Sequence, residues 1–362
     1  SACSATGPFA CDYPVLIGND DYYGGLGGAF TISTKSVTSG SVVLRHEMGH
    51  NFASVGEEYD GGSAYNGANS DSVNNLNNLK WSHWLSEPQN PQIEQANILL
   101  QAYPWLDLAQ GSYSVNFTAE GLNGGYTRWL LQFTASGVET QDSFEATLDG
   151  VSLGWITTGD LDRGFTDVFS ETPLAPGVHT LTFRQLSTPT SGNIRMICNI
   201  NLHEYGPEPM FHMDDSTFIS AYPTYASSGF RRVRPGNEFC LMRNMTSEIL
   251  CSACKESIWH QFLSRVSLID SVVRLPSSDD LVSMQLNVIP VAQFRPIPIN
   301  NEQFILQWMR NGIFQINLND LYQWTLPLSE ASGVWNVFLE FRTDEVRNDP
   351  SNLLQFTEEF TI

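Results

Sequence analysis

The spacing of apolar residues predicts one strong helix near the start of the chain. Over residues 40–55, positions three and four apart recur as on one helical face: Val43, His46, Glu47, His50 and Ala53. Gly56 is a suitable stop for this helix. Ahead of it, short apolar strands alternate with turns. The glycine-rich segment 22–28 among them allows the backbone to approach another group closely.

From about residue 99 to residue 206 the pattern changes to period two. Alternating segments at 113–117, 129–133, 144–148 and 179–183 are separated by Gly, Asp and Pro residues. Short strands at such spacing predict a β-sandwich. Residues 207–266 return to mixed character, and residues 267–362 again predict strands, which we interpret as a second, Ig-like sandwich. The chain therefore has four predicted segments: 1–98, 99–206, 207–266 and 267–362.

Composition places the chain among folded, multidomain proteins. It has 362 residues, of which 41% are hydrophobic and 16% are charged, and its formal net charge is -21. Only 18 Lys and Arg residues are spread over it, so we expect no nucleic-acid partner. Because no apolar run reaches the length of about 18 residues that a membrane helix needs, we also expect no membrane partner.

The cysteine count favours an extracellular protein. Six cysteines are compatible with three disulfides: Cys3, Cys11, Cys198, Cys240, Cys251 and Cys254. The alternative for the pair Cys251 and Cys254 is half of a zinc knuckle or a redox motif, and each needs a context that the sequence lacks. Glycosylation acceptors at Asn116 and Asn244 also indicate a secreted glycoprotein.

The predicted helix carries the motif HEMGH at positions 46–50. Residues four apart on a helix lie on one face, so His46 and His50 can offer two imidazole nitrogens to one Zn²⁺ ion. Glu47 lies beside them and can accept a proton from a zinc-bound water, whose pKa the metal lowers. The resulting hydroxide would attack a peptide carbonyl. The alternative is a helix that carries these three residues by chance.

Two carboxylates after the helix are candidates for a third zinc ligand. On a straight helix Glu57 would lie about 16 Å along the axis from His46, whereas zinc–ligand bonds measure about 2 Å. The helix must therefore end after His50, and the chain must fold back. Glu57 is the first choice and Glu58 the alternative, the other glutamate then orienting a histidine. Otherwise both are solvated charges. Three later histidines are further candidates: His83, His203 and His212.

These residues resemble the IgA-peptidase family of zinc metallopeptidases, a metzincin-like family of fungal or bacterial secreted enzymes. Three groups of segments carry the resemblance: 15–19 with 23–28; 46–50 with 56–59 and 79–84; and 234–236 with 240–244 and 251–254. The resemblance implies an α+β, zincin-type metallopeptidase domain. Its first part, 1–98, would hold the active-site helix and its second part, 207–266, a methionine turn. The sandwich at 99–206 would then be an insertion that recognises substrate or carbohydrate.

The resemblance also implies roles for individual residues. His46 and His50 match the zinc ligands, Glu47 the general base, and Glu57 the acidic third-ligand position, where the family more often has aspartate. Met242 matches the methionine beneath the metal; packing alone also accounts for a buried methionine. An aromatic residue that hydrogen-bonds the oxyanion is matched by Tyr225. The family has a larger sheet before the helix, so we expect an N-terminal segment of the same precursor as a partner.

The sequence therefore predicts a secreted zinc endopeptidase that acts on proteins or glycoproteins. One alternative is a non-catalytic, zinc-containing β-sandwich protein that binds carbohydrate or protein through aromatics such as Trp129, Trp155 and Trp335. An intact Glu47 favours the enzyme, because a binding protein does not need a general base. A zinc hydrolase of small amides is a third interpretation.

Overall fold

The computed structural model describes residues 11–362 except 29, 158, 160, 161, 191, 228, 230, 292–296, 298 and 300. The chain divides into two units, Ser1–Cys254 and Lys255–Ile362. The helix α3 (Ser252–Leu263) crosses the boundary between them. Each unit is described by itself below.

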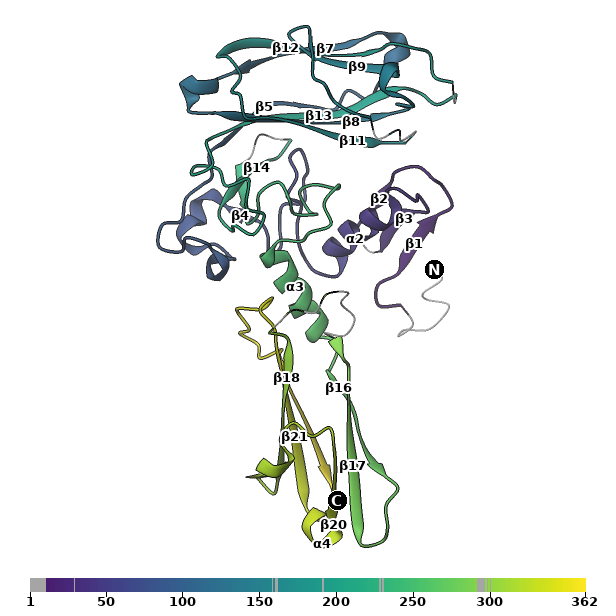
Figure 1. Cartoon of the computed structure of the whole chain (residues 1–362), viewed down its shortest axis with the longest axis vertical. Coiled ribbons are helices and arrows are strands. Elements are labelled where there is room, and N and C mark those ends of the chain that lie inside the picture. Colours follow the sequence, from purple (N-terminus) through teal and green to yellow (C-terminus); the bar gives the residue numbers. More distant parts are fainter. Residues whose placement is uncertain are drawn as a thin grey trace. The chain divides into compact units, whose positions relative to one another are not determined.

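A β-sandwich forms the central part of the first unit. Two sheets, in the orders β10-β9-β12-β7 and β11-β8-β13-β5, lie one above the other (Figure 1). Their strands are β5 (Ala96–Ala102), β7 (Tyr113–Ala119), β8 (Arg128–Ser136), β9 (Phe144–Leu148), β10 (Val151–Ser152), β11 (Gly164–Ser170), β12 (Gly177–Gln185) and β13 (Met196–Tyr205). The short β6 (Leu106–Asp107) pairs with β13. Three 3₁₀ turns connect them: Leu108–Gln110, Gly121–Gly124 and Gln141–Ser143. The period-two pattern thus predicted a sandwich correctly.

Alternate residues of these strands face inward and form one hydrophobic core. Phe133, Phe144 and Phe183 pack around Trp155, whose ring centroid lies 5.0 Å from that of Phe144. Trp129 and Trp155 are each 8% exposed. They are therefore core residues, and the prediction that they form a binding surface is wrong.

The rest of the first unit has little regular structure. Strands β1 (Val15–Gly18), β2 (Gly25–Leu26) and β3 (Thr31–Thr34) form a sheet in the order β1-β3-β2, and β2 and β3 contact α2 (Gly40–Asn51). Strands β14 (Tyr222–Tyr225), β15 (Arg231–Arg234) and β4 (Asp71–Ser72) form another. Two 3₁₀ helices, Val73–Asn78 and Ser82–Trp84, follow β4.

The second unit contains two antiparallel sheets. One has the order β16-β17-β20, with β16 (Ile269–Leu275), β17 (Leu281–Val288) and β20 (Gln323–Pro327). The other has the order β19-β18-β21-β22, with β18 (Gln303–Arg310), β19 (Ile313–Phe314), β21 (Val334–Arg342) and β22 (Gln355–Thr361). The unit also contains the 3₁₀ turn Ile316–Leu318 and the short α4 (Leu328–Ala331). Trp335 is fully buried against Trp324, so it too belongs to a core.

The predicted fold class, an α+β zincin-type domain with added sandwiches, is wrong. Strands predominate in the regular structure of the described residues, and the α-helices among them are α2, α3 and the four-residue α4. Segments 1–98 and 207–266 supply short strands and loops around two helices of 12 residues each. The prediction rested on the one helix that carries the motif. Apolar residues elsewhere alternate with period two, which indicates strands and should have decided the fold class.

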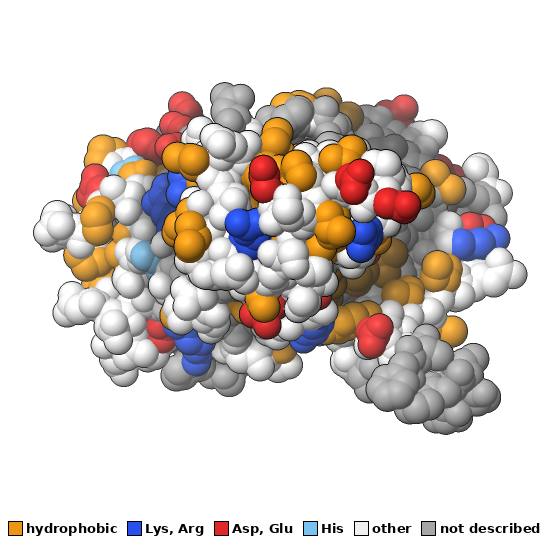
Figure 2. All heavy atoms as spheres, turned by 90° about the horizontal axis from the view of Figure 1, so that it is seen from below, with side chains coloured by type: hydrophobic (Ala, Val, Ile, Leu, Met, Phe, Trp, Pro, Cys, Tyr) orange, Lys and Arg blue, Asp and Glu red, His pale blue; other side chains and the backbone are white. Residues whose placement is uncertain are grey.

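Charged side chains of both signs are dispersed on one face of the molecule. On the face drawn in Figure 2, Lys and Arg side chains are scattered among acidic, hydrophobic and uncharged polar ones. The absence of a nucleic-acid partner stays a prediction.

A buried ion-pair network joins the loop after α2 to the turn after β15. Arg243 donates to Asp60 Oδ2 at 2.6 Å and to Glu238 Oε2 at 2.7 Å. His203 also contacts Asp60, and Arg234 donates to Glu238. Burial alone would raise the pKa of Glu238, but Arg243 and Arg234 outweigh burial and lower that pKa to about 2. The network therefore depends on a matched set of charges.

We expect the substitution R243M to destabilise the first unit by about 3–5 kcal/mol, because it leaves two buried carboxylates without their main partner. The control R184M removes Arg184 from an exposed ion pair with Glu145, where the cost is about 0–1 kcal/mol. Denaturant unfolding of the full chain measures both. Equal shifts of the unfolding midpoint in the two variants would contradict this assignment.

Candidate metal centre

The helix α2 presents the motif residues on one buried face. Val43, His46 and Gly49 are buried along it, and Ser39 caps its N-terminus. The helix ends at Asn51, four residues before the predicted end. Beyond it, Ser54 has a φ of 54°, and Val55 pairs with Gly67 in an antiparallel bridge. The chain therefore reverses directly after the second histidine, as the sequence predicted.

Two residues fix this reversal. Asn69, fully buried, accepts from the Gly56 N–H at 2.6 Å and donates to the Gly56 carbonyl at 2.9 Å. A Cβ atom at Gly56 would lie only 2.1 Å from the Asn66 carbonyl oxygen. Glycine is thus required at position 56 by the close approach of another backbone segment.

The reversal brings Glu57 to the two histidines. The Nε2 atoms of His46 and His50 lie 3.2 Å apart, and they lie 3.2 Å and 3.0 Å from the Glu57 carboxylate oxygens. Ligands about 2.0–2.1 Å from a tetrahedral zinc ion lie about 3.3–3.4 Å from one another. The two nitrogens and the Glu57 carboxylate, each histidine facing a different oxygen of it, thus have nearly the spacing that a zinc ion imposes.

The outer nitrogens of both imidazoles face backbone carbonyls. His46 Nδ1 lies 3.3 Å from the Leu241 oxygen, and His50 Nδ1 lies 2.9 Å from the Val55 oxygen. Since a carbonyl only accepts, each Nδ1 carries the proton, and in the neutral ring each Nε2 presents a lone pair. Two lone pairs and a carboxylate therefore converge on one point, which fits a cation. Burial raises the pKa of Glu57; where the histidines instead carry protons at Nε2, their hydrogen bonds outweigh burial and lower it to about 2.

Glu47 lies beside this group and contacts the glycine-rich loop. Its carboxylate accepts a hydrogen bond from the Gly27 backbone, and a Cβ at Gly27 would lie 2.9 Å from Glu47 Oε2. The predicted close approach of the 22–28 loop is therefore to the motif helix itself. Burial raises the pKa of Glu47, and the neighbouring histidines partly offset this increase.

The structure separates the two candidate glutamates. Glu57 points toward His46 and His50, whereas the carboxylate of Glu58 is fully buried among three cysteine sulfurs. Glu58 therefore does not join the histidine group. The remaining histidine candidates lie elsewhere: His203 contacts Asp60, His212 contacts Glu94, and His83 lies beside Trp84.

Met242 packs against the motif helix α2 at Gly49. It is fully buried, and a Cβ at Gly49 would lie 2.9 Å from its sulfur. Its carbonyl oxygen accepts from the Glu58 N–H at 3.0 Å. This placement fits the role that the sequence resemblance gave to Met242.

The structure does not bring Tyr225 to the histidine group. It is the last residue of β14, and its hydroxyl donates to the Ala96 carbonyl at 2.8 Å, toward the sandwich. Tyr23 and Tyr59 line the cavity at His46 instead. Burial raises the pKa of Tyr23, and nearby Glu47 and Glu57 add to the increase. Neither tyrosine was predicted from the sequence, although Tyr59 directly follows Glu58 and Tyr23 lies in the glycine-rich segment 22–28.

A cavity of about 400 Å³ opens beside His46 and Glu47. One wall consists of α2 and the glycine-rich loop. The opposite wall is the outer face of the sandwich, with polar residues such as Gln132, Asn199 and Asn201. Arg163 lies in this wall, 5.1 Å above the ring centroids of both Tyr23 and Trp105.

The predicted set of three disulfides is wrong. Cys198, Cys240, Cys251 and Cys254 are buried free thiols, and Cys11 is disulfide-bonded. Cys3 lies outside the described residues. Three of the four thiols surround Glu58, which the sequence could not indicate because the cysteines lie about 180 residues or more beyond it.

Comparisons with known proteins do not assign the chain. No family model and no curated protein matches it. A family 35 carbohydrate binding module from Clostridium thermocellum is similar at 12% identity and a TM-score of 0.20, over 31% of this chain and 97% of the module. A GH2 β-galacturonidase from Eisenbergiella tayi is similar at 10% identity and a TM-score of 0.19, over 74% of this chain. The match covers 44% of that enzyme, less than half of its length. Both TM-scores are too low to support an argument.

Among the described residues, no helix has the length and apolar character to span a bilayer. Secretion stays a prediction.

We expect the substitution E57A to lower the zinc affinity of the histidine group by more than about 100-fold. Removal of a residue that only hydrogen-bonds to a metal ligand lowers metal affinity by roughly 10–100-fold. The effect of E57A is larger because it removes one of three converging ligand atoms. The control is E87A, since Glu87 is exposed. Titration of metal-depleted full-length protein with Zn²⁺ measures both. An unchanged affinity in E57A would exclude Glu57 as a ligand.

Proposed function

We propose that the chain is a zinc-dependent endopeptidase in which His46, His50 and Glu57 hold the metal and Glu47 is the general base. One observation carries this proposal: two imidazole Nε2 lone pairs and a carboxylate converge at separations of 3.0–3.2 Å. The helix motif supplies a base next to them. The resemblance to the IgA-peptidase family supports the same assignment from sequence alone.

Each residue would contribute a distinct step. A zinc ion bound here would act as a Lewis acid, lowering the pKa of a water molecule and polarising the substrate carbonyl. Glu47 accepts the proton of the attacking water, and the Gly27 N–H holds its carboxylate in place. The Leu241 and Val55 carbonyls fix the rings of His46 and His50, so that Nε2 faces inward. Tyr23, in the cavity wall, donates its hydroxyl to the developing oxyanion.

The cavity suggests a macromolecular substrate. Its outer wall is a sheet face of the sandwich, which offers amide side chains such as Asn199 and Asn201 for contacts along an extended chain. We propose a protein or glycoprotein substrate outside the cell.

A second candidate is a non-catalytic, zinc-containing β-sandwich protein that binds carbohydrate or protein. The predominance of strands favours it, since sandwich strands account for most regular structure in the described residues. Trp105, exposed at 53%, lies in the cavity and could stack on a ligand. The two candidates share the metal and differ in whether Glu47 acts on water.

The substitution E47Q separates them. We expect E47Q to retain zinc and to lose about 10²–10⁴-fold in peptide hydrolysis, because an amide cannot accept the proton. Cleavage of denatured protein and of a mixed peptide library is measured together with zinc content. If wild type and E47Q both hold zinc and neither cleaves, the binding protein is the better assignment.

The tyrosine assignment has a matched test within the chain. We expect Y23F to reduce kcat by about 10²–10³-fold with little effect on zinc content, as for loss of one oxyanion donor. Y225F is the control, because the Tyr225 hydroxyl is bonded to the Ala96 carbonyl. A larger loss of kcat in Y225F than in Y23F would restore the prediction made from the sequence.

A further inference from the structure

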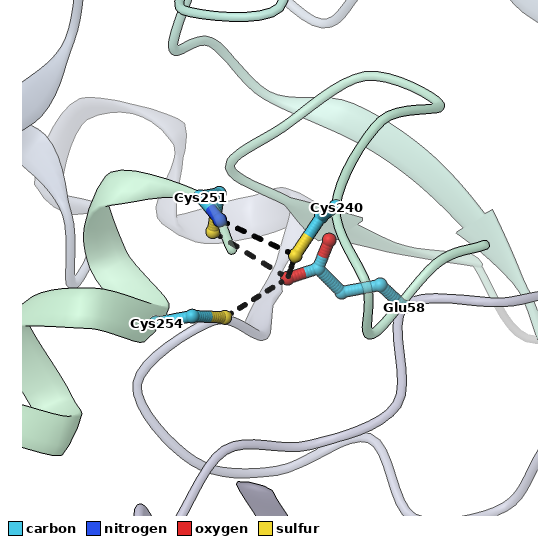
Figure 3. A group of neighbouring side chains, drawn as sticks. All are labelled: Glu58, Cys240, Cys251 and Cys254. Atoms are coloured by element: carbon cyan, nitrogen blue, oxygen red, sulfur yellow. Dashed lines mark hydrogen bonds between the residues drawn. The ribbon is translucent and has the colours of Figure 1, made fainter. Parts of the chain in front are cut away.

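A second group of metal-ligating side chains lies outside the histidine group. It consists of Glu58, Cys240, Cys251 and Cys254, whose ligand atoms all lie within 4.8 Å of one another (Figure 3). Glu58 comes from the loop after α2, and Cys240 comes from the turn after β15. Cys251 directly precedes the helix α3, and Cys254 lies in the first turn of that helix. Glu58 thus meets two cysteine segments that lie 182 residues or more beyond it in the sequence.

The spacing within the group is that of a tetrahedral site. Glu58 Oε1 lies 3.5 Å, 3.7 Å and 3.4 Å from the sulfurs of Cys240, Cys251 and Cys254 respectively. With bonds of about 2.3 Å to sulfur and about 2.0–2.2 Å to oxygen, a tetrahedral zinc ion separates these atoms by about 3.5–3.7 Å.

Burial makes the group costly unless something compensates it. Glu58 and Cys254 are 0% exposed, Cys240 is 3% exposed and Cys251 is 8% exposed. Asn69 donates to Glu58 Oε1 at 2.8 Å, but the buried Oε2 has no hydrogen-bond partner. A fully buried carboxylate that is only partly satisfied calls for a cation or a proton.

We propose that Glu58, Cys240, Cys251 and Cys254 bind a Zn²⁺ ion in a closed, four-coordinate structural site. Four protein ligands without a solvent-exposed position are typical of structural zinc and leave no place for substrate. Thiolates select soft or borderline metals, and tetrahedral geometry favours zinc among them. A glutamate in place of a fourth cysteine or a histidine is the unusual feature of this site.

The main competing state is a disulfide. Three thiols cannot all pair with one another, so a disulfide would leave one cysteine and the Glu58 carboxylate buried together. The zinc site uses all four side chains at once. The pair Cys251 and Cys254 also has the spacing of half a zinc ribbon, and Cys240 and Glu58 complete it from other segments.

The proposed ion would also stabilise the histidine group, although the site does not depend on the proposed function. Cys240 directly precedes Leu241, whose carbonyl faces His46 Nδ1, and Met242, which packs under α2. Glu58 directly follows Glu57, and its N–H donates to the Met242 carbonyl. An ion bound at this site would thus fix the turn and the loop that position His46 and Glu57.

The test uses the full chain loaded with Co²⁺ or Zn²⁺. We expect wild type to bind two zinc ions and the Co²⁺ form to show strong thiolate-to-cobalt charge-transfer absorption in the near ultraviolet. C254S should lose one ion and most of that absorption. C198S is the matched control, since Cys198 is an equally buried free thiol outside the group, and it should retain both. H50A should lose one ion but keep the absorption.

The comparison of H50A with C254S distinguishes this site from the histidine group. Loss of hydrolysis with the cobalt absorption intact would count against the proposed function alone. Absence of thiolate-to-cobalt absorption in wild type would overturn the second site, as would a disulfide between any two of Cys240, Cys251 and Cys254 in the intact protein. If C254S does not fold, the wild-type absorption and zinc count decide.

Discussion

The hydrogen bond from the Glu58 N–H to the Met242 carbonyl, 3.0 Å long, joins the two segments on which both metal-ligating groups depend. It fixes the loop after α2 against the turn after β15. Adjacent side chains of that loop then point in opposite directions, Glu57 to the histidines and Glu58 to the cysteines. Neighbouring residues of the turn also face the two groups: the Leu241 carbonyl faces His46, whereas the Cys240 sulfur faces Glu58.

This arrangement explains why the buried polar groups are so densely connected. Asp60, two residues after Glu58, accepts from Arg243, which follows Met242. The ion pairs thus join the same loop and turn as the backbone hydrogen bond does. Three of the four residues 57–60 are acidic, and two of them, Glu58 and Asp60, are buried. Each needs a specific partner, because an unpaired buried charge costs far more than a lost apolar contact.

The sequence predicted the parts that local spacing controls. The HEMGH motif placed His46, Glu47 and His50 on one face of α2, and the distance argument required the chain to reverse before Glu57. Period-two alternation predicted the sandwich. The cysteine group could not be found in this way, since its four residues come from three segments and no spacing rule links Glu58 to Cys240. The prediction for Tyr225 rested on a resemblance in the loop before Arg234. That resemblance did not determine the direction of the side chain, whose hydroxyl bonds to the Ala96 carbonyl.

Polar junctions add to the apolar packing around the histidine group. Among the described residues, large hydrophobic cores lie in the sandwich of the first unit and in the second unit. The helix α2 and the loops that follow it lie outside both, although Val43, Val55 and Met242 are buried there, and their sheets have strands of only two to four residues. In a region with such short strands, specific cross-links add stability to the apolar packing, as they do in small metal-binding domains. The cysteine group and the ion-pair network would thus stabilise the loop after α2 and the turn after β15. The histidine group can then remain open to the cavity, because these two groups hold its residues in place.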